Sequence, residues 1–277
     1  MRKTLEYAVR ILFGICLCLL SVILIHYGRR IFIADSFRIP SSSMSPTLNP
    51  GDRVLVNKLL FGPRIYTGFD FSRDAPLRCL RLPGIRDVRP GDVIVFNFPF
   101  GYDDWSRIEF RINYVFCKRV AGCPGDRIGI TDGHCWNSRI PGSIGIPERQ
   151  DALESTPDSI FIRNNCLTAI PLSRPYWSIK NMGPLSVPAK GDYVKLTPFT
   201  ASLYRHIIEY ETGLSLICGA DGDILLDGRR ILEYKFTRNW YFALGDNSPD
   251  SNDSRYWGFI PEDFIIGIVS GLSLRTQ

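Results

Sequence analysis

The residue that points most directly to chemistry is a lysine in an apolar row. At the period of two that a β-strand imposes, Ile112, Tyr114, Phe116, Lys118 and Val120 share one face. A lysine in such a row either extends its amine to water, as at the edge of a sheet, or is partly desolvated. Desolvation lowers the pKa of the amine until it can serve as a base near neutral pH. Lys118 is therefore a candidate general base.

A general base needs a nucleophile, and a serine-rich turn offers several. Four serines occupy five positions shortly after an apolar N-terminal run, at Ser41, Ser42, Ser43 and Ser45. Turns of this composition are usually only turns. A Ser-His-Asp triad would have to use His134, which lies in a Gly-Cys-Trp turn, or His206, which lies in a predicted helix. Neither setting suits a triad, so a Ser-Lys pair is the better hydrolase hypothesis.

The apolar N-terminal run predicts a membrane anchor. Residues 11–27 carry no formal charge and lie between Arg10 and the pair Arg29-Arg30. A helix of this run covers roughly 25 Å at about 1.5 Å per residue, and the flanking arginines can extend it toward the ~30 Å hydrocarbon slab. A cleavable signal peptide is the alternative, but the run is long for one and no Ala-x-Ala-like site follows.

We therefore expect an uncleaved transmembrane helix at residues 11–28, preceded by a short N-terminal segment, 1–10. The cationic residues on the two sides slightly favour a cytoplasmic N-terminus. No second apolar run of spanning length follows, so the remainder is expected on one side of the membrane. The net charge of +5 comes from interspersed residues and gives no support for a nucleic-acid partner.

The chain after the anchor is predicted to be mainly β. A Gly-Asp turn, often preceded by proline, comes before a β-prone run at five places: Gly51-Asp52, Gly91-Asp92, Gly125-Asp126, Gly191-Asp192 and Gly222-Asp223. Asp227-Gly228 predicts a hairpin. Only residues 199–212 read as a helix, with Gly213 as its stop. That helix lies in a region, about 131–220, that we expect to be an insertion, and a smaller insertion without a strand pattern is expected at 63–88.

Six cysteines lie outside the anchor, and their spacing fits no paired Cys-x-x-Cys zinc site. Disulfides are plausible in an oxidising compartment, but their pairing stays open. These cysteines are Cys79, Cys117, Cys123, Cys135, Cys166 and Cys218.

Three polar segments occur in an order that resembles the bacterial type I signal peptidases, the Ser-Lys peptidases of family S26. The first is Ser-Ser-Ser-Met-Ser-Pro-Thr-Leu at 41–48, and the second is Lys-Arg-Val-Ala-Gly-Cys-Pro-Gly-Asp at 118–126. The third, at 245–258, runs from Gly-Asp-Asn to Asp-Ser-Arg-Tyr-Trp-Gly and would by itself be read as a polar loop. The resemblance implies a signal-peptidase-like β core with an inserted β-rich cap subdomain that contains one helix, behind a single transmembrane helix.

The resemblance also assigns roles to residues. It implies Ser43 as nucleophile and Lys118 as general base, with an acyl-enzyme intermediate. It implies that the Ser43 backbone N–H and the Ser41 hydroxyl hold the oxyanion and that the Ser251 hydroxyl orients the lysine amine. Four charged residues would brace the site: Arg119, Asp246, Asp253 and Arg255. Ser42 departs from the glycine usual in many members, so the choice of nucleophile rests on the register of Met44.

By this resemblance residues 36–277 form an extracytoplasmic peptidase domain on the bacterial cytoplasmic membrane. The substrates would be signal peptides with small residues at −1 and −3, bound as an added strand. The bilayer and the secretion machinery would be the other partners, and no cofactor or metal is suggested. A peptidase dedicated to one conjugation or pilus precursor and a non-catalytic membrane-anchored β scaffold are the alternatives.

Overall fold

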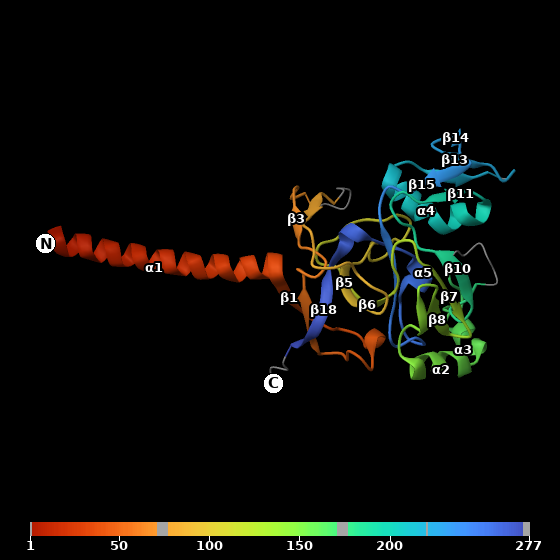
Figure 1. Ribbon diagram of the computed structural model, residues 1–277, viewed down its shortest axis with the longest axis horizontal. Coiled ribbons are helices and arrows are strands. Elements are labelled where there is room, and N and C mark those ends of the chain that lie inside the picture. The colour runs from red at the N-terminus through yellow and green to blue at the C-terminus, as the bar shows by residue number, and fades with distance from the viewer. Residues whose placement is uncertain (1, 71–76, 171–176, 220, 274–277) are drawn as a thin grey trace.

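The computed structural model describes residues 2–70, 77–170, 177–219 and 221–273. Its first element is a long helix, α1 (Arg2–Gly28), which continues through one π-helical turn (Arg29–Ile33). In Figure 1 this helix extends away from the rest of the molecule. Within the described residues, Val9–Ile33 is the one helical segment long and apolar enough to cross a membrane, by length and composition alone. The predicted anchor falls inside it.

The helix leads directly into a seven-stranded antiparallel sheet. Its order is β1-β2-β18-β5-β6-β16-β17, so strands from the beginning, middle and end of the chain are neighbours. The N-terminal strand pair is thereby held beside the C-terminal strand (Figure 1). The bounds are β1 (Ala34–Arg38), β2 (Arg53–Asn57), β5 (Val93–Asn97), β6 (Val115–Gly122), β16 (Trp240–Leu244), β17 (Ile260–Pro261) and β18 (Ile265–Ser273).

Smaller sheets surround this one, so the prediction of a mainly β fold is confirmed. The chain between β6 and β16 forms a four-stranded sheet, a three-stranded sheet and a two-stranded sheet. Their strands are β7 (Arg127–Thr131), β8 (His134–Asn137), β9 (Ile140–Ser143), β10 (Met182–Ser186), β11 (Tyr193–Lys195), β12 (Leu216–Cys218), β13 (Ile224–Leu226), β14 (Arg229–Arg230) and β15 (Glu233–Lys235). The segment 63–88 also contains a strand pair, β3 (Arg64–Tyr66) and β4 (Cys79–Arg81), so the expectation of no strands there is wrong.

All five predicted Gly-Asp turns precede strands, namely β2, β5, β7, β11 and β13. Each glycine has a positive φ, between 80° and 97°, which a residue with a side chain rarely adopts. In four of the turns the aspartate carboxylate accepts the backbone N–H three residues earlier, at distances of 2.8 to 3.0 Å. The turn sequence therefore specifies both the backbone shape and its hydrogen bond. The Asp227-Gly228 hairpin between β13 and β14 is likewise confirmed.

The predicted helix is α4 (Pro198–Thr212), which ends at Gly213 with φ 70°. The expectation that region 131–220 contains only one helix is wrong, because α2 (Pro147–Ser155) and α3 (Asp158–Arg163) precede it. In α2 only Gln150 and Leu153 are buried, so its sequence has no amphipathic stripe to detect. A last short helix is α5 (Ser254–Trp257).

Two apolar clusters support the middle of the seven-stranded sheet. One contains Phe96, Phe98 and Val120 with Trp257 from α5. The other contains Val95 from β5 and is joined by Cys117 from β6. Alternate residues of β5 and β6 thus enter different clusters, as the period of two requires.

Candidate active site

Lys118 lies in the middle of β6, and its amine meets a serine far away in sequence. Its side chain is buried, with 3% of the residue exposed. Lys118 Nζ donates a hydrogen bond to Ser43 Oγ at 2.5 Å across 75 positions of sequence. Ser43 is the central residue of a 3-10 turn (Ser42–Met44) that follows β1. The structure therefore brings together the two residues predicted to act as nucleophile and base.

Burial lowers the pKa of the Lys118 amine, because desolvation disfavours the charged form more than the nearby Asp253 carboxylate favours it. The Phe116 ring lies 5.5 Å from Nζ and stacks on Phe98 at 4.4 Å between ring centroids. The apolar row is thus present around the amine. Ile112 is the exception, since it is 37% exposed, whereas Tyr114 packs against the same apolar cluster as Phe116.

The serine turn is held in place by apolar residues on both sides of it. Met44 is 1% exposed and packs in one cluster with Ile39 and Leu48. Ser41 Oγ lies 3.3 Å from Ser43 Oγ. The first N–H groups of a helical turn have no acceptor within the turn, which leaves the Ser43 N–H free of an intrahelical partner. An N–H and a hydroxyl therefore lie beside the nucleophile, although their oxyanion role stays a prediction.

The loop 245–255 clamps this turn from the other side. The Asn247 backbone N–H donates to Ser43 O at 3.1 Å, and Asn247 Nδ2 donates to Ser42 O at 3.2 Å. The Ser42 hydroxyl donates to Asp250 Oδ2 at 3.2 Å. Sequence reasoning missed Asn247 and Asp250 as positioning residues. Their place within the third polar segment was the available signal, because that segment had to approach the serine turn.

Two ion pairs brace the loop. Arg119 donates to both carboxylate oxygens of Asp246, at 2.7 and 2.6 Å, and Asp246 also accepts a hydrogen bond from Thr47 of the serine segment. Arg255, which is 2% exposed, donates to both oxygens of Asp253 at 2.8 and 2.9 Å. All four residues predicted to brace the site are thus found in ion pairs around it. Thr47 was missed.

Ser251 is buried, with 7% of the residue exposed. Its hydroxyl makes no hydrogen bond within the part of the chain that the structure describes, so the predicted orientation of Lys118 by this hydroxyl stays a prediction. A Cβ placed on Gly245 would lie 2.0 Å from Ser251 Oγ and 2.5 Å from Ser43 O. Gly245 is therefore the residue that lets the loop approach the serine turn.

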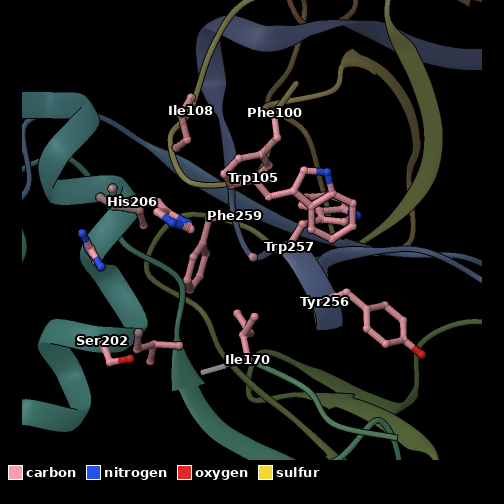
Figure 2. Close-up of a pocket in the computed structure, with 13 residues that line it drawn as sticks. Phe100, Trp105, Ile108, Ile170, Ser202, His206, Tyr256, Trp257 and Phe259 are labelled. Carbon is pink, nitrogen blue, oxygen red and sulfur yellow. The ribbon is translucent and has the colours of Figure 1, made fainter. Parts of the chain in front are cut away.

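Neither candidate histidine takes part in a triad. His206 lines a cavity of about 310 Å³ between α4 and the segment that follows α5. Figure 2 shows its imidazole facing this cavity together with Trp105 and Phe259. His134 lies beside carboxylates of α2, and no histidine among the described residues is hydrogen-bonded to Ser43.

All eight cysteines are free thiols. The disulfides that the sequence made plausible are therefore not formed in this structure. Burial raises the pKa of the Cys117, Cys123 and Cys135 thiols to about 12, which makes them poor nucleophiles. The cysteines consequently supply no argument about the redox compartment of the domain.

The sequence is similar to a known protein family and to individual members of that family. Residues 12–138 and 228–272 match the family model described as signal peptidase, peptidase S26. The chain is 36% identical over 242 residues to Signal peptidase I of Pseudomonas aeruginosa, covering 87% of this chain and 61% of that protein. It is 27% identical over 252 residues to Signal peptidase I of Buchnera aphidicola subsp. Baizongia pistaciae, covering 90% and 72% respectively. With Signal peptidase I of Haemophilus influenzae the identity is 26% over 268 residues, covering 90% and 66%.

Proposed function

Because this chain belongs to the signal peptidase family, peptidase S26, we propose that it is a membrane-anchored serine endopeptidase that removes signal peptides from exported preproteins. The observation that carries this proposal is the 2.5 Å contact between Ser43 Oγ and the buried Lys118 Nζ. A buried amine with a lowered pKa is neutral at a pH where an exposed lysine is charged, so it can accept a proton.

In this mechanism the Ser43 hydroxyl attacks the scissile carbonyl while its proton passes to neutral Lys118. The tetrahedral intermediate places its oxyanion near the Ser43 N–H and the Ser41 hydroxyl, which stabilise the developing charge. The scissile C–N bond then breaks as the Lys118 ammonium gives this proton to the leaving amine, which leaves Ser43 as an acyl-enzyme. Water deprotonated by Lys118 hydrolyses the ester and restores both side chains.

Each bracing contact has a role in this scheme. The Asn247 bonds to Ser42 O and Ser43 O hold the turn at a fixed distance from β6. The Asp246 pair with Arg119 fixes the loop that carries Asn247. Ser251 Oγ and Ser43 O both lie against Gly245, so Ser251 is beside the serine turn, and the proposal keeps the lysine-orienting role of its hydroxyl.

The position of the helix supports a single-pass arrangement. We place residues 1–10 in the cytoplasm, the anchor at 11–28, and the peptidase domain, 36–277, on the outer side of the cytoplasmic membrane, with the inserted cap at about 131–220. Only the π-helical turn separates α1 from β1, and β1 ends three residues before Ser41. The nucleophile is thereby kept near the membrane surface, where a signal peptide emerges. The substrate would have small side chains at −1 and −3 and would bind as an added strand.

The test is cleavage of a panel of preproteins by the purified full-length protein in detergent. Ser43→Ala and Lys118→Ala should each abolish cleavage while the circular dichroism spectrum and thermal unfolding remain those of a folded protein. Cleavage of a single preprotein from the panel would favour the dedicated peptidase. Full activity in either variant, or no cleavage by the unaltered protein, would overturn the assignment.

A further inference from the structure

Three potential metal ligands converge on one side of the region between β6 and β16. His134 Nε2 lies 3.4 Å from Asp151 Oδ1 and 3.3 Å from Glu154 Oε2. The ligand atoms of all three residues lie within 4.8 Å of one another. His134 opens β8, whereas Asp151 and Glu154 are one helical turn apart on α2 and therefore share a face of that helix. This cluster is separate from the Ser43 and Lys118 pair.

The backbone on both sides of the cluster is held firmly. Gly133, with φ 87°, forms the turn before His134 and lies so close to α2 that a Cβ on it would be 3.1 Å from Gln150 O and 3.2 Å from Glu154 N. The buried Gln150 side chain bonds back to Ile144 O, and Leu153 is fully buried. The ligand-bearing face of α2 is thus fixed against the start of β8.

One imidazole nitrogen faces two carboxylates. A neutral imidazole carries one N–H, so Nε2 can donate to only one of the two carboxylates that approach it. Within the described parts of the chain, neither Asp151 nor Glu154 pairs with an arginine or lysine side chain. The neighbouring Lys180 instead contacts Asp158 and the backbone carbonyls of Glu154 and Thr156. Two carboxylates therefore share one imidazole nitrogen, a donor set that a divalent cation can bind.

Two of the three ligand separations match the edge of a tetrahedral transition-metal site. At metal–ligand bonds of about 2.0–2.1 Å, the edge of a tetrahedron is about 3.3–3.4 Å. The distances from His134 Nε2 to Asp151 Oδ1 and Glu154 Oε2, 3.4 and 3.3 Å, have this length. One imidazole and two carboxylates suit Zn²⁺ better than Mg²⁺, which keeps an octahedral shell of oxygens. Both carboxylates are more than half exposed, which leaves the fourth position open to water.

We propose that His134, Asp151 and Glu154 bind one Zn²⁺ ion that ties the start of β8 to α2. The ion has no part in the Ser43 and Lys118 chemistry, so this site and the proposed peptidase activity stand or fall separately. Its effect is on the insertion itself: the bound metal stabilises the folded form, in which the three ligands are together, over the unfolded chain.

The experiment uses the full-length protein in detergent, stripped with a chelator, with its accessible thiols alkylated so that exposed cysteines cannot bind metal. Zn²⁺ is titrated against a competing chromophoric chelator. We expect one equivalent bound by the unaltered protein, no such binding by His134→Ala, and binding at least about tenfold weaker for Asp151→Asn or Glu154→Gln. Excess Mg²⁺ should not displace the ion.

Glu148→Gln is the matched control, because Glu148 is an exposed carboxylate on α2 outside the cluster, and its binding should equal that of the unaltered protein. Zn²⁺ should also raise the thermal unfolding midpoint of the unaltered protein and the control but not of His134→Ala. Equal Zn²⁺ affinity in His134→Ala and the unaltered protein would overturn the proposal. So would failure of the unaltered protein to bind one equivalent.

Discussion

Arg119 and Asp246 form an ion pair with two hydrogen bonds. Arg119 directly follows Lys118 in the sequence, and Asp246 directly follows Gly245. Asp246 is 1% exposed at its side chain, and Arg119 is 19% exposed. The pair joins β6, which carries Lys118, to the loop that holds the serine turn. The distance between Ser43 and Lys118, the proposed nucleophile and base, therefore depends on a contact that takes no part in the proposed chemistry.

We predict that Asp246→Ala lowers the free energy of unfolding by about 3 kcal/mol, because it leaves a largely buried guanidinium without its partner. The double variant Arg119→Leu, Asp246→Leu should lose less unfolding free energy than Asp246→Ala, because it leaves no unpaired charge. Arg230→Ala, which breaks an exposed pair with Asp223, is the control and should cost about 0.5 kcal/mol or less. Denaturant unfolding measures all three. If Asp246→Ala were as stable as the control Arg230→Ala, the ion pair between Arg119 and Asp246 would not brace the loop.

Alanine substitution of the three adjacent serines, Ser41, Ser42 and Ser43, should lower kcat to different extents. Ser43→Ala should lower kcat by at least about 10⁴-fold, because it removes the nucleophile. Ser41→Ala should lower kcat by about 10²–10³-fold if its hydroxyl holds the oxyanion. Ser42→Ala should lower kcat far less than either of these changes, since it removes only the hydrogen bond from the Ser42 hydroxyl to Asp250. Steady-state cleavage of a preprotein peptide checks the series, and loss of activity in Ser42→Ala with retention in Ser43→Ala would reassign the nucleophile.

Activity should depend on pH through Lys118. The folded-state pKa of its amine lies below the ordinary value of 10.5, so kcat/KM should fall on acidification through this lowered pKa as the base becomes protonated. The rate profile should show a single protonation on that side. Unfolding measured at the same pH values serves as control for loss of structure. A rate that stays flat from neutral to mildly acidic pH would exclude a lysine base.

The lowered pKa of Lys118 also makes the stability of the protein depend on pH in a defined direction. Between the lowered pKa and 10.5 the unfolded chain binds more protons at Lys118 than the folded chain does, so this residue makes stability rise with pH. Lys118→Met removes that dependence. The free energy of unfolding of Lys118→Met should therefore exceed that of the unaltered protein most at low pH, and the difference should shrink as pH rises toward 10.5. A gain independent of pH would indicate that Lys118 is not desolvated.

Gly245→Ala should impair the site without touching a reacting atom. The new methyl group would overlap Ser251 Oγ and Ser43 O, so the loop must move away from the serine turn. We expect kcat to fall sharply. Gly271→Ala in β18 is the matched control, because a Cβ there meets no heavy atom within 4 Å. Comparison of kcat in the two variants tests the prediction, and equal activity would show that this close approach is not needed.

The sequence by itself determined the features that depend on neighbouring residues. The Gly-Asp turns specify their own backbone shape and hydrogen bond, the helix ending at Gly213 has a local stop, and the apolar run before Arg29 forms a continuous helix. The alternation around Lys118 left two alternatives, an amine that reaches water or one that is partly desolvated, and only the structure shows that Lys118 is buried. Where local signals were weak, prediction failed. The short helix α2 buries only two residues, so packing and not periodicity holds it in place.

Only the tertiary structure decided which of these residues meet. Ser43 and Lys118 are 75 positions apart, and Asp246 lies a further 128 positions along, so their contacts depend on β6 pairing with β5 on one side and β16 on the other. The same pairing made Asn247 a positioning residue and left the Ser251 hydroxyl without a partner among the described residues. Hydrogen bonds and desolvation act over a few ångströms, and no short stretch of sequence records which distant groups the sheet brings within that range.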